Sequence, residues 1–423
     1  MKIALIGYEA NVPYRVGSNQ YAFELLKALY QEDHKNHYTV FLPSPPLSDL
    51  PEPRDNWQYK IVGPRRFWNI LGLPLALFRY HPKLDVVFNP GHYCPLFSPA
   101  PLVVSIMDLG YLKFPQHFPK VTYWKLKFWT ALSIKRAKNL LTISQRTKND
   151  IIKHYQIEPK KITVAYPGYD QDKFKKKVSE QEIKEVKDRY KIKDDYLLFL
   201  STLKPSKNIE GLLEAFAQLK DQNLSSVIAG KKGWMFETVF AKVKDRYKIK
   251  DDYLLFLSTL KPSKNIEGLL EAFAQLKDQN LSLVIAGKKG WMFETVFAKV
   301  KDLGLVEKVI FTDFVPDEDV PALLTGAKVF VLPSFWEGFG IPVVEAMVVG
   351  TPVVVSNVGS LPEVVGEAGI IVDPKNPKDI TRGIKEAFKK REELIDRGFK
   401  QVSQYDWGKC ARKVLKVLSE DKK

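Results

Sequence analysis

The chain has 423 residues, of which 45% are hydrophobic and 12% aromatic, and its formal net charge is +16. This length and apolar content suffice for two folded domains and exclude a disordered chain. The longest strongly apolar run, residues 70–78, is broken by a proline and is shorter than the roughly 20 residues of a membrane span. Two cysteines, Cys94 and Cys410, argue against a disulfide framework and favour a reducing, cytoplasmic setting.

Apolar runs alternate with helical patterns along the first part of the chain, and the start MKIALIG predicts a buried strand rather than a secretion signal. Strands are predicted at residues 2–6, 38–42, 86–88, 102–106, 140–143 and 162–166. Such alternation predicts a parallel sheet covered by helices. We expect residues 1–166 to form a Rossmann-like domain and the polar residues 167–185 to form a linker.

An internal repeat follows: residues 186–245 recur at 243–302, with Ser226 against Leu283 as the one difference. Two copies at a period of 57 residues indicate a recent in-frame duplication, or an engineered or assembly-derived one, rather than a solenoid. We expect copy one, residues 186–242, to be an insertion. Copy two is continuous with the next strand, and Leu283 suits a buried strand better than Ser226.

The second domain is expected at residues 243–400, with residues 401–423 forming a helix that returns to the first domain. Its predicted strands are residues 253–257, 281–286, 309–311, 329–332, 352–355 and 369–372. These again alternate with helical patterns and predict a parallel sheet. Ligands of such sheets bind beyond the carboxyl ends of the strands.

Residues 334–347 read SFWEGFGIPVVEAM and connect a predicted strand to a predicted helix. Gly338 and Gly340 permit a close approach of backbone and ligand, and the free amides at the helix start favour a diphosphate. Glu345 is expected in the first helical turn, where a carboxylate can accept two ribose hydroxyls, while Glu337 faces the sugar beyond the far phosphate. The pattern predicts a sugar-nucleotide site rather than a loop with two solvated glutamates.

This string resembles the donor-site signature of the retaining glycosyltransferases of family 4, the group 1 glycosyltransferases. Resemblance to that family continues in the segments RVGSNQYAFELLKAL, ISQRTKNDIIKHYQIEPKKITVAYPGYD, LSTLKPSKNIEGLLEAFAQL and TPVVVSNVGSLPEVVGEAGIIVDP, so it covers nearly the whole chain. It implies the α/β GT-B fold, with two Rossmann-like domains facing a cleft: residues 1–166 on the acceptor side and residues 243–400 binding the donor. It also implies transfer of a mannose- or glucose-type hexose from a GDP- or UDP-hexose to a glycan or lipid-linked acceptor, without metal or cofactor. The KPSKN and IAGKKGW wording is closest to the branch that uses GDP-mannose.

Site roles follow from the same resemblance. Glu337 and Asp108 are expected to be catalytic. Donor contacts are expected from Gly17, Thr259, Lys264, Gly338, Phe339, Gly340, Ile341 and Glu345. Lys264 suits a cation on the diphosphate, with Lys261 as an assistant and Lys207 as its twin in copy one.

Two positions depart from the family pattern. Relatives often have an arginine where Thr259 stands and a histidine where Met107 stands. His92 is the nearest histidine that can substitute for it, although a lone histidine is more often structural. Two alternatives therefore stay open: a GT-B sugar-nucleotide epimerase or hydrolase, and a binding or scaffold subunit without activity.

The net positive charge is concentrated in two stretches, residues 64–83 and 117–139, in which lysines and arginines alternate with aromatic residues. Such stretches can lie on an anionic membrane surface, or their apolar side chains can be core while the lysines are solvated. The resemblance favours the membrane, because many relatives glycosylate lipid-borne acceptors. We expect a cytoplasmic protein, peripheral on the inner face of the cell membrane, that binds no nucleic acid.

Overall fold

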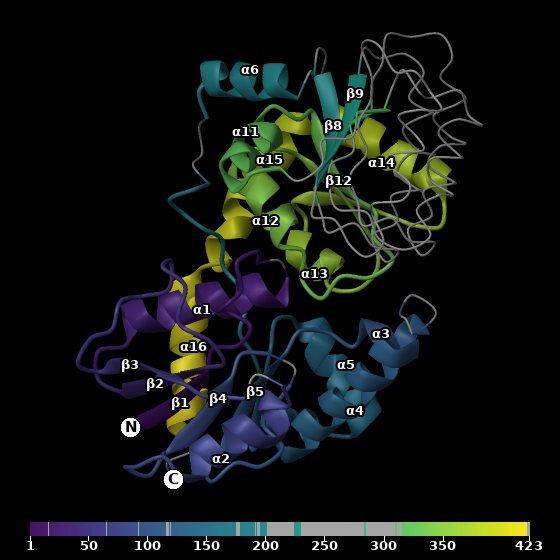
Figure 1. Cartoon of the computed structure of the whole chain (residues 1–423). Helices are drawn as coiled ribbons and strands as arrows, with labels where there is room; N and C mark the ends of the chain where they lie inside the picture. The colour runs from purple at the N-terminus through teal and green to yellow at the C-terminus, as the bar shows by residue number, and fades with distance from the viewer. Residues whose placement is uncertain are drawn as a thin grey trace, which may run out of the picture. The chain divides into compact units, whose positions relative to one another are not determined.

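The structure is a computed structural model that describes residues 1–200, 224–229, 283–284, 309–310 and 315–420, without residues 16, 65, 92, 116, 117, 119, 175–177, 191, 193 and 194. The chain divides into two compact units. Unit 1 comprises Met1–Gly168 and Tyr405–Lys423, and unit 2 comprises Tyr169–Gln404. Each unit contains a seven-stranded parallel sheet with helices on its faces (Figure 1). No helix within the described ranges is both long and apolar enough to cross a membrane.

The sheet of unit 1 has the strand order β3-β2-β1-β4-β5-β6-β7. The strands are β1 (Lys2–Ile6), β2 (His37–Leu42), β3 (Trp57–Ile61), β4 (Val86–Asn89), β5 (Leu102–Ile106), β6 (Asn139–Thr142) and β7 (Ile162–Val164). The sequence predicted six of them but not β3, a mostly exposed edge strand of which only Trp57 is buried. The order reverses between β1 and β4, and open parallel sheets bind ligands beyond the carboxyl ends of the strands at such a reversal.

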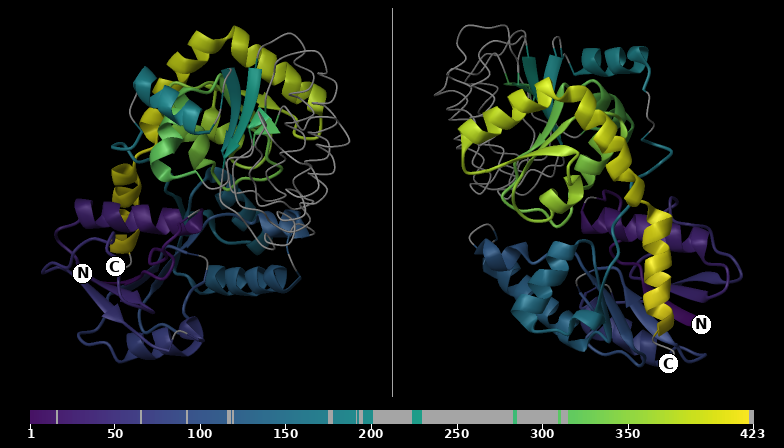
Figure 2. Two further views of the ribbon diagram at one scale, coloured as in Figure 1. Left: turned by 45° about the horizontal axis from the view of Figure 1, so that its top comes forward. Right: turned by 180° about the vertical axis from the view of Figure 1, so that it is seen from behind.

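Helices cover both faces of this sheet. One face holds a buried cluster to which α2 (Leu73–Phe78), α4 (Lys120–Arg136) and α5 (Gln145–Tyr155) contribute side chains. On the opposite face, α1 (Ser18–Glu32) packs against α16 (Trp407–Glu420), as Figure 2 shows. The rings of Tyr21 and Trp407 lie 5.8 Å apart, and Arg412 Nη1 donates to Glu32 Oε2 at 2.7 Å. Unit 1 therefore includes a helix from the far end of the chain.

The sheet of unit 2 has the order β11-β10-β9-β8-β12-β13-β14. Its strands are β8 (Asp195–Leu200), β9 (Leu224–Ala229), β10 (Leu283–Val284), β11 (Val309–Ile310), β12 (Val329–Leu332), β13 (Val353–Ser356) and β14 (Gly369–Val372). Its helices include α6 (Glu180–Arg189), α11 (Val320–Thr325), α12 (Ile341–Val348), α13 (Leu361–Val365), α14 (Pro377–Lys389) and α15 (Arg391–Gln401). Gly383 of α14 lies directly over Val354 and Val372, which brings this helix onto one face of the sheet.

Copy one of the repeat lies inside this sheet. Its strand β8 pairs with β12, with Leu197 opposite Val329, and its strand β9 pairs with β10 of copy two, with Ser226 opposite Leu283. The place beside β12 thus belongs to copy one, not to the copy that we expected in this domain. The prediction that copy one is inserted outside the domain is wrong for β8 and β9. The other residues of both copies, apart from α6 and β10, lie largely outside the described ranges.

Copy one takes this place in the sheet because of the segment that precedes it. Ser179 and Glu182 form a reciprocal cap at the start of α6: Ser179 Oγ accepts from the Glu182 amide at 3.2 Å, and Glu182 Oε2 accepts from the Ser179 amide at 2.9 Å. Residues 179–185 occur only before copy one. The predicted linker 167–185 is therefore shorter, because α6 begins at Glu180.

Hydrogen bonds that involve the buried Asp319 and Tyr196 then attach copy one to α11 and to the residue before it. Arg189 and Tyr190 bind the carboxylate of Asp319, which is 3% exposed, and the Tyr190 hydroxyl donates to it at 2.7 Å. The fully buried Tyr196 donates its hydroxyl to Leu323 O at 2.7 Å. Copy two repeats the same residue types, so these contacts do not by themselves select a copy. The cap of α6 does.

This arrangement predicts different effects for twin substitutions. Tyr196→Phe should lower the free energy of unfolding by about 1–2 kcal/mol, because it leaves the buried Leu323 carbonyl without its donor. The twin Tyr253→Phe should leave stability unchanged. Chemical denaturation of both variants measures the difference, and a larger loss for Tyr253→Phe would mean that copy two lies beside β12.

Candidate functional site

The turn after β12 is shaped by a left-handed glycine. All four residues of β12 are buried, and α12 begins at Ile341 after Gly340, whose φ is 101°. This backbone conformation strongly disfavours residues with a side chain. A Cβ at Gly340 would also lie 2.8 Å from Leu361 Cδ2. The glycine thus lets the chain reverse from the buried strand into the helix start, with Pro342 within its first two positions.

Glu337 is held in this turn by hydroxyl groups. Its side chain is 8% exposed, and Ser334 Oγ donates to its Oε1 at 2.8 Å. Ser360 Oγ donates at 3.1 Å to the carbonyls of both Glu337 and Phe339, and Ser356 Oγ donates to Ser334 O at 2.5 Å. Ser334 therefore orients the carboxylate, while Ser356 at the end of β13 and Ser360 after it hold the backbone of the turn.

Gly359 lies against the backbone of Glu337. Its φ is +64°, and a Cβ on it would lie 2.6 Å from Glu337 O and 2.9 Å from Glu337 N. Only glycine fits this approach. The sequence analysis missed Ser334, Ser356, Gly359 and Ser360 as site residues. The available signal was the SNVGS segment directly after a buried strand, which was interpreted only as part of the fold.

The remaining predicted residues of this turn have different surroundings. Glu345 is the fifth residue of α12 and half-buried, so its predicted place in the first turn is wrong, because the helix begins only after Gly340. The side chain of Phe339 is 3% exposed, so it is part of the core. Gly338 in the turn and Ile341 at the start of α12 are half-buried. The structure thus brings Gly338, Gly340 and the α12 start next to a fixed Glu337.

In unit 1, three predicted residues lie at the carboxyl edge of the sheet or near it. Gly17 caps α1 with a φ of 59°, and no atom lies within 4 Å of a Cβ built on it. Asp108 follows β5, and its Oδ1 accepts from the Gly110 amide at 2.7 Å. Met107 is 6% exposed, and its carbonyl accepts from Thr147 Oγ1 at 2.9 Å. Their ligand-binding roles stay predictions. His92, Lys207, Thr259, Lys261 and Lys264 lie outside the described residues.

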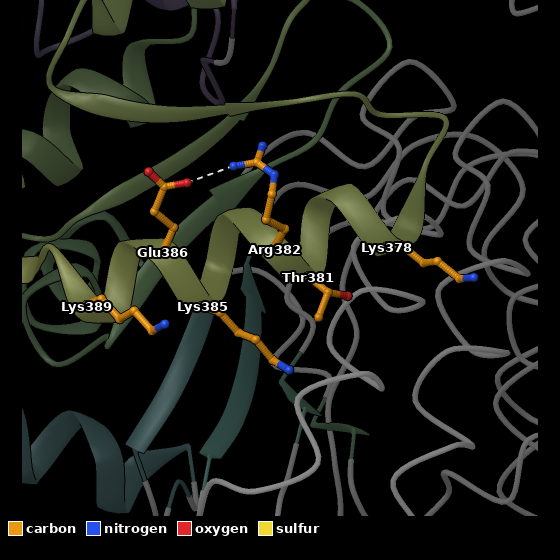
Figure 3. A pocket seen from close by; sticks show the side chains of 6 residues that line it. All are labelled: Lys378, Thr381, Arg382, Lys385, Glu386 and Lys389. Atoms are coloured by element: carbon orange, nitrogen blue, oxygen red, sulfur yellow. Dashed lines mark hydrogen bonds and ion pairs between the residues drawn. The ribbon is translucent and has the colours of Figure 1, made fainter.

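A surface depression of about 570 Å³ runs along α14 (Figure 3). Its described lining comes from one helix face: Lys378, Thr381, Arg382, Lys385, Glu386 and Lys389. Arg382 Nη1 donates to Glu386 Oε2 at 2.7 Å, one turn away. No residue of the Glu337 turn is among these six. The described lining of the depression is thus mostly charged side chains of α14, and it contains none of the residues predicted from the sequence.

Comparisons with known proteins agree with the predicted family. Residues 16–173 match the family model of glycosyltransferase family 4, and residues 240–401 match that of glycosyl transferases group 1. O-antigen chain mannosyltransferase B of Escherichia coli is 39% identical over 169 residues, 38% of this chain and 44% of that protein. The chain thus spans less than half of that relative. O-antigen chain mannosyltransferase RfbU of Salmonella typhimurium is 26% identical over 353 residues, 82% of this chain and 79% of that protein.

Among solved structures, HepE of Anabaena in complex with UDP and glucose has a TM-score of 0.67 and 18% identity, covering 99% of this chain and 100% of that chain. The two proteins share the GT-B fold. The group 1 match runs through copy two, whereas the strand beside β12 comes from copy one. Because the copies differ at one position, continuity with residue 303 explains why the sequence match selects copy two.

The approach of Gly359 to Glu337 predicts a local effect of Gly359→Ala. We expect a loss of about 1–3 kcal/mol in stability and weaker nucleotide binding, because the added methyl group displaces the Glu337 backbone. Gly350→Ala is the matched control: its φ is also positive, at 79°, but the nearest atom to its Cβ is a Phe399 ring carbon at 3.3 Å. The control should lose stability only. Denaturation and calorimetry with GDP and UDP measure both effects, and equal nucleotide affinities in the two variants would contradict this interpretation.

Proposed function

Because this chain belongs to the group 1 glycosyltransferases and has their GT-B fold, we propose that it transfers mannose, with retention of configuration, from GDP-mannose to a glycan or lipid-linked acceptor. The observation that carries the proposal is the buried Glu337, fixed by hydroxyls just before the start of α12. The names of two relatives, both O-antigen mannosyltransferases, support mannose. UDP in the HepE complex makes a UDP-hexose the other donor to test.

Each part of the turn has a distinct task in this reaction. The dipole at the start of α12 stabilises the negative charge that develops on the departing diphosphate. Gly338 and Gly340 leave room for phosphate oxygens close to the backbone. Glu337, oriented by the hydrogen bond from Ser334, binds a hydroxyl of the transferred hexose. Glu345 binds the ribose hydroxyls from one turn further along α12.

A cation on the diphosphate completes this proposal. Lys264, with Lys261 and Thr259 nearby in the sequence, fills this role if copy two lies beside β12, and Lys207 fills it if copy one does. The pairing of β8 with β12 favours Lys207. The comparison of Tyr196→Phe with Tyr253→Phe therefore also indicates which lysine is the candidate. The leaving phosphate then accepts the proton of the attacking hydroxyl, so no further base is required.

Two glutamate variants test these roles. Glu345→Gln should weaken GDP binding about 10- to 100-fold, because a hydrogen bond to a charged group contributes roughly 1.5–3 kcal/mol. Glu337→Gln should keep GDP affinity and lower turnover of GDP-mannose by at least about 100-fold. The half-buried Glu386, which pairs with Arg382 on α14, provides the control Glu386→Gln with no expected effect. Unchanged nucleotide affinity in Glu345→Gln, for both GDP and UDP, would rule out its ribose contact.

We also propose that unit 1 binds an anionic membrane surface, from which a lipid-linked acceptor is reached. Helix α4 has no acidic residue, and its Val121, Trp124 and Phe128 are 82%, 62% and 61% exposed at helical spacing. Lys127 Nζ lies 4.8 Å from the centre of the Trp124 ring. Exposed aromatic rings beside lysines suit the boundary between lipid headgroups and acyl chains.

A second apolar patch supports the same surface. It consists of four apolar side chains that are each at least half exposed. Phe67 lies just before η1 (Trp68–Gly72), Leu71 lies on η1, and Leu75 and Phe78 lie on α2. The inner residues of α2 and α4 belong to the same buried cluster, so both helices cover one face of the sheet. Their outward side chains therefore lie on the same side of unit 1.

Vesicle sedimentation tests membrane binding. The protein should bind vesicles that contain phosphatidylglycerol more strongly than pure phosphatidylcholine vesicles, and less so at high salt. The double variant Trp124→Ala/Phe128→Ala should lose at least about tenfold in affinity, since each aromatic side chain buries apolar area in the interface. Ile371→Ala, at a 38% exposed position of β14, serves as the control. Equal binding of the double variant and the wild type would contradict the proposal.

A further inference from the structure

A polar cluster lies at the point where the strand order of unit 1 reverses. Glu9 follows β1, and Gly91 follows β4, the neighbouring strand on the other side of the reversal. A Cβ on Gly91 would lie 2.9 Å from Glu9 Cγ, so the two loops are in direct contact. Open parallel sheets bind ligands in the crevice at such a reversal.

The carboxylate of Glu9 is held through one oxygen. Ser18 Oγ donates to Oε2 at 3.4 Å, and Asn19 Nδ2 donates to the same oxygen and to the Glu9 carbonyl at 3.2 Å. No donor among the described residues reaches Oε1. Burial raises the pKa of Glu9, and the hydrogen bond from Ser18 and the charge of Lys125 only partly offset this effect. Oε2 of the carboxylate is thus held by residues of α1, while Oε1 can accept a further hydrogen bond.

Two tyrosines flank this carboxylate. Tyr8 is 39% exposed and stacks on Trp68 with ring centres 5.9 Å apart, and the indole of Trp68 is itself fixed by a 2.9 Å bond to Val62 O. Tyr93 is half-buried, with Lys125 Nζ 5.2 Å from its ring centre. Burial, followed by the charge of Glu9 and by Tyr8, raises the pKa of Tyr93. Tyr8 directly precedes Glu9 in the chain, and Tyr93 comes two residues after Gly91, which contacts the Glu9 side chain.

A cap for α1 does not explain these groups. A neutral side chain can accept the same bonds from Ser18 and Asn19, and a partly buried carboxylate costs stability that a neutral group does not. Neither tyrosine contributes to the cap. An aromatic ring beside a carboxylate and an amide is a combination that suits a sugar: the ring covers the apolar C–H face, and the oxygens accept bonds from hydroxyls.

We propose that Tyr8, Glu9 and Tyr93 form the subsite that binds the terminal sugar of the acceptor glycan. Glu9 accepts a hydrogen bond from an acceptor hydroxyl through Oε1, and Tyr8 stacks on the pyranose ring. Glu9 is a positioning residue for the acceptor and takes no proton in the reaction. The inference rests on the proposed glycosyl transfer, but the subsite is assembled within unit 1 alone.

Glycoside binding to the full chain tests the subsite without requiring the reaction. Saturation-transfer NMR with methyl α-mannopyranoside and methyl α-glucopyranoside should detect binding to the wild type. Glu9→Gln and Tyr8→Ala should weaken it by at least about tenfold, and Tyr93→Phe should weaken it less. GDP and UDP affinities, measured by calorimetry, should be unchanged. Glu24→Gln in the middle of α1, where Glu24 accepts from Gln20 Nε2 at 2.9 Å, is the matched control.

The pH dependence separates ligand binding from a structural role. Since the pKa of Glu9 is raised above its ordinary value of 4.5, glycoside affinity should fall as pH drops through that raised value and stay flat in Glu9→Gln. Lys125 of α4 and Tyr93 are the charged and titratable side chains that act on Glu9 or respond to it, and burial holds the pKa of Tyr93 above its ordinary value. A raised carboxyl pKa also means that folding favours the protonated form, so stability from this group is lost as pH rises through it. Glu9→Gln should therefore be at least as stable as the wild type at neutral pH.

Each outcome decides between these interpretations. Equal glycoside binding by Glu9→Gln, Tyr8→Ala and the wild type would overturn the subsite, and a lower thermal stability of Glu9→Gln at neutral pH would identify a structural cap. Absence of glycoside binding to the wild type, with nucleotide binding intact, would overturn the subsite but not the proposed function. Glycoside binding without any GDP or UDP binding would refute the proposed function and leave the subsite standing.

Discussion

The site in unit 2 depends on a close approach of two backbone segments. The chain after β13 passes so near to the turn after β12 that only the hydrogen of Gly359 fits against Glu337. This approach brings the hydroxyls of Ser356 and Ser360 onto the carbonyls of the β12 turn. Because these carbonyls are satisfied internally, the turn keeps its shape in front of α12. The orientation of Glu337 is thus a result of strand packing, not only of its own sequence.

Unit 2 also shows how context selects between nearly identical sequences. The two copies of the repeat have nearly the same strand sequences and the same tyrosine, and the capping sequence of residues 179–185 precedes copy one alone. The chain that leaves α6 enters β8 after a few residues and pairs with β12. Short connections cost less entropy than long ones, so the strand that is nearest along the chain from the cap takes the position. Equivalent strands of the two copies then become neighbours at Ser226 and Leu283.

The sequence was sufficient for the buried parts of the fold and insufficient for contacts between distant segments. Strands such as β1, β5 and β12 are continuous apolar runs, which parallel sheets require, so pattern alone located them. The edge strand β3 alternates Gln58 and Lys60 with Trp57, Tyr59 and Ile61, so it is no continuous apolar run and gave no such signal. Glu337 and Gly340 were predicted from their spacing in one string. Ser360 and Gly359 were not, because their role depends on a contact with a turn 22 or more residues earlier, which no local pattern encodes.

Helix α16 has a consequence for the order in which the protein folds on the ribosome. Unit 1 needs α16 on its sheet, but this helix is synthesised after all of unit 2. Throughout translation of residues 169–404, the face of α1 that contacts Trp407 and Arg412 stays exposed to solvent. The amino-terminal unit is therefore completed last, although domains commonly fold in the order of synthesis. A nascent chain stalled within unit 2 would present that apolar face to chaperones.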